Sequence, residues 1–182
     1  MHTLIFLKNK HLYIIFISSF ILSFFISGCK KNKNANEDIK VFSKDKIIKI
    51  FEGNCTFKEI LKDTRFDDLE YIQNYDKIFI EIPENHYDNI TVTEYILNTT
   101  GEYKYLSKNE GTELELEQED NTISFKIKPN FITMFSSNGE DYDKGKTIKG
   151  YSLKCKKNDT IKNYSFVIKG DAAIVNIETP MQ

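Results

Sequence analysis

The chain is poor in arginine and histidine. Among its 182 residues, which carry a net charge of −2, Arg65 is the only arginine and there are three histidines. Proteins that bind nucleic acid normally present a strongly basic face. Sites that clamp phosphate or carboxylate depend on the planar fork of arginine. The composition therefore argues against nucleic acid as a partner and against an arginine-built anion site.

The motifs of common catalytic centres are also missing. The sequence contains no Cys-x-x-Cys pair, no serine within Gly-x-Ser-x-Gly and no glycine-rich phosphate loop. His86 is the only histidine beyond residue 11, so histidines cannot supply a zinc triad. It lies in the turn-rich stretch PENHYDN, where a solvated side chain is the simplest interpretation. We therefore expect a protein that is not an enzyme and that has no cofactor.

The N-terminus has the composition of an export signal. Lys8 and Lys10 precede a run of about 17 uncharged residues, which ends in the small residues Ser27 and Gly28. A positive start, an apolar segment and a small-residue cleavage zone are typical of a secretory signal peptide. The alternative is a retained membrane-spanning helix, for which this run has about the minimum length.

The stretch ISGC, residues 26–29, decides between these alternatives. It resembles the lipobox of bacterial lipoproteins, in which an aliphatic residue and two small residues precede a cysteine. The resemblance implies a signal peptide at residues 1–28, cleavage before Cys29, and a lipid carrying acyl chains such as palmitate on its thiol. Two or more acyl chains give stable anchoring. We therefore expect a protein held to the cell membrane on its extracytoplasmic face, with residues 29–44 as a polar, flexible tether.

Removal of residues 1–28 would leave 154 residues with 23 basic and 27 acidic side chains. This length suits one domain. Two cysteines would remain for the folded part, Cys55 and Cys155. Outside the cytoplasm an even pair permits one disulfide. The alternative is two free, mostly buried thiols.

Most of the chain after residue 76 alternates with a period of two. KIFIEIP at 77–83 and NITVTEYIL at 89–97 are typical strands. A turn at Asp120-Asn121 would set Leu116 opposite Phe125, with Glu115 opposite Lys126 on the other face. A turn at 158–159 would set Leu153 opposite Tyr164 and Tyr151 opposite Phe166, with Cys155 pointing inward.

Before these strands, NCTFKEILKD predicts a short helix. Thr56 would be its N-cap, and Glu59 would complete a capping box. We expect residues 45–75 to form a small α/β segment and residues 76–182 an antiparallel β-sandwich. Several short strands separated by turns are typical of that fold.

The strand order resembles that of bacterial immunoglobulin-like domains. The family hallmarks are absent, because the chain has no tryptophan and its two cysteines are far apart. A small barrel is the rival architecture.

The acidic stretch SSNGEDYDKGK offers weak metal ligands, Asp141 and Asp143, with the spacing Asp-x-Asp-x-Gly. Calcium prefers such oxygen ligands, but the glutamate of an EF-hand loop is missing, because position 152 is serine. An acidic surface loop without metal is the preferred interpretation.

The leading hypothesis for the function of the protein is a non-catalytic binding module at the cell envelope with a protein partner. The alternatives are an inhibitor or immunity-type lipoprotein that blocks an envelope enzyme, and a metal-dependent enzyme.

Overall fold

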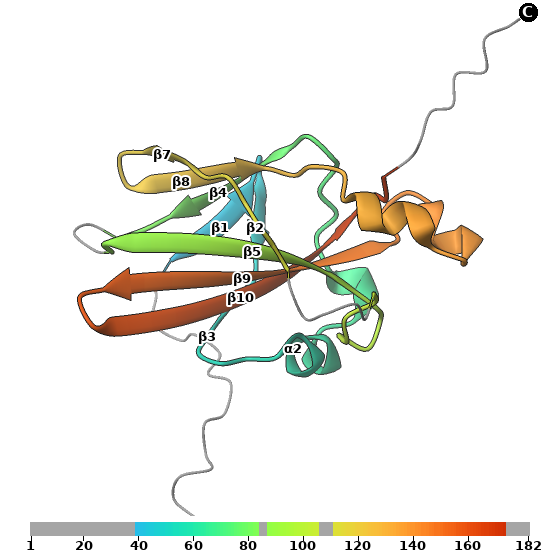
Figure 1. Cartoon of the computed structure of the whole chain (residues 1–182), viewed down its shortest axis with the longest axis horizontal. Coiled ribbons are helices and arrows are strands. Elements are labelled where there is room, and N and C mark those ends of the chain that lie inside the picture. Colours follow the sequence, from blue (N-terminus) through green and yellow to red (C-terminus); the bar gives the residue numbers. More distant parts are fainter. Residues whose placement is uncertain (1–38, 84–86, 106–110, 174–182) are drawn as a thin grey trace, which may run out of the picture.

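The computed structural model describes residues 39–83, 87–105 and 111–173. The predicted signal peptide (1–28), Cys29 and His86 lie outside these residues. The described part is mainly β and forms two five-stranded antiparallel sheets, with one α-helix (Figure 1). None of its helices is both long enough and apolar enough to span a membrane.

The first sheet has the strand order β2-β1-β4-β8-β7. Its strands are β1 (Lys40–Ser43), β2 (Lys46–Ile48), β4 (Lys77–Glu81), β7 (Glu117–Glu119) and β8 (Thr122–Lys126). The second sheet has the order β3-β10-β9-β5-β6. Its strands are β3 (Ile50–Glu52), β5 (Asn89–Leu97), β6 (Thr112–Glu113), β9 (Thr147–Lys157) and β10 (Thr160–Gly170). The chain passes repeatedly from one sheet to the other, so neither sheet is a separate unit.

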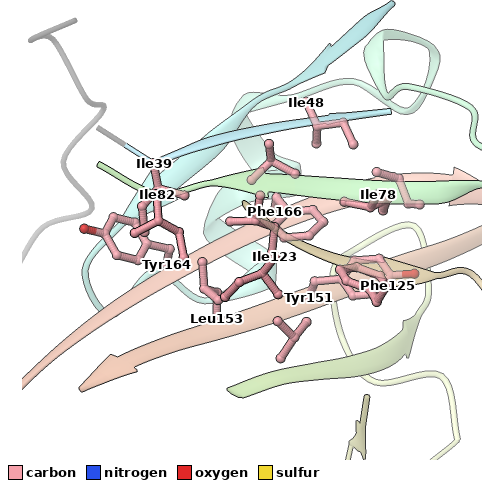
Figure 2. Packing of buried hydrophobic residues seen from close by; sticks show 14 of the residues in the cluster. Ile39, Ile48, Ile78, Ile82, Ile123, Phe125, Tyr151, Leu153, Tyr164 and Phe166 are labelled. Carbon is pink, nitrogen blue, oxygen red and sulfur yellow. The ribbon is translucent and has the colours of Figure 1, made fainter. Parts of the chain in front are cut away.

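The main core lies between the two sheets. Ile78 and Phe125 from the first sheet meet Tyr151, Leu153 and Phe166 from the second, and all five are buried (Figure 2). The rings of Tyr151 and Phe166 stack with centroids 4.9 Å apart. This arrangement agrees with the predicted sandwich, and within the described residues the strands do not close into the rival barrel.

A second, smaller core lies on the outer face of the second sheet. There α2 (Phe57–Asp63) packs Phe57 and Ile60 against Leu97 and Val167. Gly150 makes this approach possible, because a Cβ at that position would lie 2.8 Å from the Phe57 ring. The helix begins at the predicted capping box, with Thr56 as N-cap.

Three short 3₁₀ helices complete the described elements: η1 (Phe66–Asp68), η2 (Phe131–Phe135) and η3 (Gly139–Tyr142). The last two lie together at one end of the sandwich, in the segment that joins β8 to β9 (Figure 1).

The predicted turn positions of both hairpins are confirmed. In β9 and β10, Leu153 pairs with Tyr164 and Tyr151 with Phe166. In β7 and β8, Glu119 pairs with Thr122 around the turn at residues 120–121.

The predicted charge pair of Glu115 with Lys126 in the β7–β8 hairpin is wrong. The pairing ends at Glu117, because the chain before it crosses to β5 in the other sheet. Glu115 therefore contacts Lys128, at 2.8 Å, and not Lys126.

Two predicted boundaries also need correction. The folded part already includes Ile39 and strand β1, inside the segment 29–44 that was expected to be a tether, and Val41 is fully buried. Strand β1 pairs with β4, and this pairing fixes it in the first sheet. Residues 45–75 do not form an α/β segment of their own, because β2 joins the first sheet and β3 the second.

Candidate functional site

A groove of about 730 Å³ lies on the outer face of the second sheet, and we call it the outer groove. Its floor is formed by two cross-strand pairs, Ser152 with Ser165 and Lys154 with Asn163, from β9 and β10. These side chains point outward because they alternate with the inward residues of the main core. The floor is therefore polar, although it lies directly above an apolar core.

One wall of the outer groove is aromatic. Tyr95 from β5 lies between Phe57 of α2 and Tyr103, with ring centroids 5.4 Å and 5.2 Å away. Burial raises the pKa of Tyr95, and the nearby Tyr103 adds to this shift, so the Tyr95 hydroxyl stays neutral at physiological pH. Tyr103 is 36% exposed and offers a ring edge and a hydroxyl to the groove.

The loop after β5 (98–104) holds this wall in place. The Asn98 side chain accepts hydrogen bonds from the backbone of Thr100 (2.9 Å) and of Glu102 (3.0 Å). Gly101, with φ of +83°, lies against the start of α2, where a Cβ would come within 2.5 Å of the Phe57 carbonyl oxygen. A residue with a side chain therefore cannot occupy position 101 without moving the loop away from the helix.

The rim of the outer groove carries charges of both signs. Lys58 pairs with Glu102 at 3.2 Å, and Lys104 pairs with Asp141. On the floor, Asn163 donates to the Asn54 side chain at 2.9 Å. The groove therefore presents aromatic surface, hydrogen-bonding groups and balanced charge, which suits a partner segment that is polar without a strong net charge.

The structure separates the two cysteines that were predicted as a disulfide. Cys155 lies in the main core between the sheets, whereas Cys55 belongs to the smaller core on the opposite face of the second sheet. Cys155 is fully buried and its thiol is free, so the predicted Cys55–Cys155 disulfide is wrong. Burial raises the pKa of this thiol to about 12, and a neutral buried thiol is unreactive.

The two weak metal candidates, Asp141 and Asp143, have different surroundings in the structure. Asp141 accepts hydrogen bonds from Lys104 and Ser136. Burial raises the pKa of this carboxyl, but those two hydrogen bonds outweigh it, and the net shift is downward. Asp143 is exposed. The described residues contain no group of three or more His, Cys, Asp or Glu side chains that could hold a metal ion.

A buried polar cluster was missed in the sequence. Glu94 of β5 and Lys149 of β9 are 5% and 0% exposed, and the lysine Nζ lies 3.4 Å from Glu94 Oε2. Tyr151 donates to the same oxygen at 2.9 Å. Asn130, the N-cap of η2, donates from Nδ2 to Glu94 Oε1 at 2.9 Å. Lys149 also donates to the Lys128 carbonyl at 3.0 Å.

The alternation of inward and outward residues along β5 and β9 already indicated this buried cluster. Glu94 takes an inward position in the series that contains Ile90 and Val92, and Lys149 does so in the series that contains Tyr151 and Leu153. A charged residue in phase with the apolar face must be buried, and a buried charge needs a partner.

Comparison of the chain with protein-family models, with curated proteins and with solved structures finds no match.

Proposed function

We propose that this protein is a membrane-anchored extracytoplasmic lipoprotein that acts as a non-catalytic binding module at the bacterial cell envelope. The observation that carries the proposal is the outer groove, which combines an aromatic wall with a polar floor on the exposed face of a rigid sheet. Tyrosine is favoured at protein interfaces because it offers a large ring and a polar tip. The partner that suits this groove is a segment of another envelope protein.

The proposed fold type is the immunoglobulin-like sandwich. Two antiparallel sheets enclosing a single main core, and a chain that crosses repeatedly between them, support this type. Domains of this architecture usually bind through surfaces and loops on a stable framework, and the loop 98–104 beside the outer groove fits that mode.

The lipid anchor limits where the partner can lie. Cys29 and Ile39 are ten residues apart, and such a stretch spans at most about 36 Å when fully extended. The folded domain would therefore stay close to the membrane surface. A partner that reaches the outer groove would be another membrane protein, or a soluble protein that approaches the membrane.

The surroundings of Asp141 favour the binding module over the alternative of a metal-dependent enzyme. The carboxylate of Asp141 already pairs with a lysine, which occupies the position that a cation would need. An inhibitor or immunity-type role remains one form of the proposed binding, in which the bound partner is an enzyme.

Site-specific photo-crosslinking tests the proposal. A benzophenone amino acid is placed at position 103 in the full chain, and cells are irradiated before the membranes are solubilised. We expect one discrete protein adduct, because Tyr103 lies in the groove wall. The matched control is position 142, because Tyr142 has the same exposed fraction of 36% but lies outside the outer groove.

A second variant links the adduct to the groove floor. Lys154→Glu reverses the charge of an outward-facing side chain, and it should weaken the adduct at position 103 several-fold. A pattern of adducts that is the same at positions 103 and 142, or no adduct at position 103, would contradict the proposed use of the groove. The identity of the adduct then shows whether the partner is an enzyme.

A further inference from the structure

The buried cluster of Glu94, Lys149 and Asn130 brings together an amine, an amide and a carboxylate. One carboxylate contacts both reactive groups, because Glu94 Oε2 lies 3.4 Å from Lys149 Nζ and Oε1 lies 2.9 Å from Asn130 Nδ2. The lysine and the glutamate are more than nine-tenths buried. Because the Glu94 carboxylate contacts both nitrogen atoms, the carboxylate can carry a proton from one to the other.

We propose that Lys149 and Asn130 form an intramolecular amide cross-link, with Glu94 as the proton carrier. In this reaction the lysine Nζ attacks the side-chain carbonyl carbon of Asn130. A new C–N bond forms, the bond from that carbon to Nδ2 breaks, and Nδ2 leaves as ammonia. The reaction needs no oxidant or further reactant.

The protons balance within the cluster. Glu94 first accepts a proton from the lysine ammonium, which leaves a neutral amine able to attack. Glu94 then gives its proton to the leaving Nδ2 and receives the second proton from Nζ. The products are a secondary amide, ammonia and a protonated Glu94.

The asparagine side chain is oriented for this reaction. Its Nδ2, the leaving group, points to the Glu94 carboxylate, which can protonate it. Its Oδ1 accepts a hydrogen bond from the backbone N–H of Ile132 at 3.2 Å. A backbone donor at this oxygen stabilises the negative charge that develops there when the amine attacks.

The lysine also contacts the backbone of the segment that carries the asparagine. Its Nζ hydrogen-bonds to the Lys128 carbonyl, two residues before Asn130. Both Glu94 and Asn130 line a second groove of about 690 Å³, through which ammonia can leave. The cross-link would join β9 of the second sheet to the segment that follows β8 of the first, so it would tie the two sheets together.

Peptide mapping of the full chain, purified from membranes and digested with trypsin, tests the cross-link. We expect a branched peptide in which residues 127–144 and 147–154 are joined, with a mass one ammonia below the sum of its parts. Cleavage after Lys149 should be lost, because trypsin does not cut at an acylated lysine. A free peptide 147–149 in near-stoichiometric amount would overturn the proposal.

Two variants identify the chemistry. Lys149→Arg keeps a positive charge beside Glu94 but removes the nucleophile, and Glu94→Gln removes the proton carrier, so both should abolish the branched peptide. The loss of one ammonia without a branched peptide would show cyclisation at Asn130 instead, and would also overturn the proposal. The wild-type map decides the question even if a variant fails to fold.

Discussion

Tyr151 and Glu94 face each other across strands β9 and β5, and the tyrosine hydroxyl donates to the buried carboxylate at 2.9 Å. Both residues belong to the inner face of the second sheet, where most neighbours are apolar. Burial raises the pKa of Tyr151 well above its ordinary value, and the Glu94 carboxylate adds to this shift. This pair fixes one end of the main core.

We predict that Tyr151→Phe destabilises the fold by about 1–3 kcal/mol, because it removes a hydrogen bond from the buried carboxyl group of Glu94. Urea unfolding measures the change. The matched control is Tyr71→Phe, which removes the same hydroxyl from a bond to Asp171 of 2.8 Å at a part-buried site. The control should lose less stability, and equal losses would contradict the importance assigned to burial.

The buried thiol of Cys155 predicts a stability that depends on pH. Its pKa rises from an ordinary 9.0 to about 12 in the folded state. Above pH 9 the unfolded chain ionises this thiol while the folded chain keeps it neutral, so stability falls as the pH rises from 9 to 12. At pH 10, one unit above the unfolded pKa, the expected loss is about 1.4 kcal/mol.

The measurement compares wild type with Cys155→Ala at pH 8 and at pH 10. The variant loses packing equally at both pH values, so its deficit relative to wild type should shrink at pH 10. A deficit that does not change would show that the thiol ionises in the folded state as easily as in the unfolded one. Alkylation of Cys155, followed by mass mapping, should also require denaturant.

Gly101 is predicted to be essential to the outer groove. Gly101→Ala adds a Cβ that would lie 2.6 Å from the Cα of Lys58 in rigid backbone, at a positive φ. The control is Gly53→Ala, where φ is +96° and the space around the Cβ is open. The control should cost only the left-handed strain, about 1–2 kcal/mol. Gly101→Ala should cost more in thermal unfolding, and equal costs would contradict the close approach.

The capping box of α2 gives a fourth prediction. Thr56 accepts from the Glu59 backbone at 3.3 Å, and Glu59 accepts from the Thr56 backbone at 2.9 Å. Thr56→Ala should destabilise the fold by about 1 kcal/mol. Thr56→Ser keeps the oxygen and should restore most of that loss. A serine variant as unstable as the alanine variant would show that the methyl group, and not the cap, matters.

The sequence predicted those parts of the fold that depend on local pattern. The turn after Lys157 and the register of β9 with β10 follow from alternation and turn chemistry, and the capping box follows from residues three apart. The pairing of β6 with β5 and the pairing of β1 with β4 could not be predicted in this way. They depend on which sheet a short strand joins, and that choice is made by long-range packing.

The candidate site was less predictable than the fold. Ser152, Lys154 and Asn163 look like ordinary surface residues, and only the folding of loop 98–104 beside them creates the outer groove. The proposed disulfide failed for a related reason. Alternation placed Cys155 on the inner face correctly, but it gave no information on the side of the sheet to which Cys55 belongs.

The central claim is that this binding module is held to the membrane through Cys29. The most direct measurement feeds cells labelled palmitate and compares the wild-type chain with Cys29→Ala. The claim predicts that wild type carries the label and migrates as a shortened protein, whereas the variant carries no label and keeps residues 1–28. Label that persists in Cys29→Ala, or a wild type without label, would contradict it.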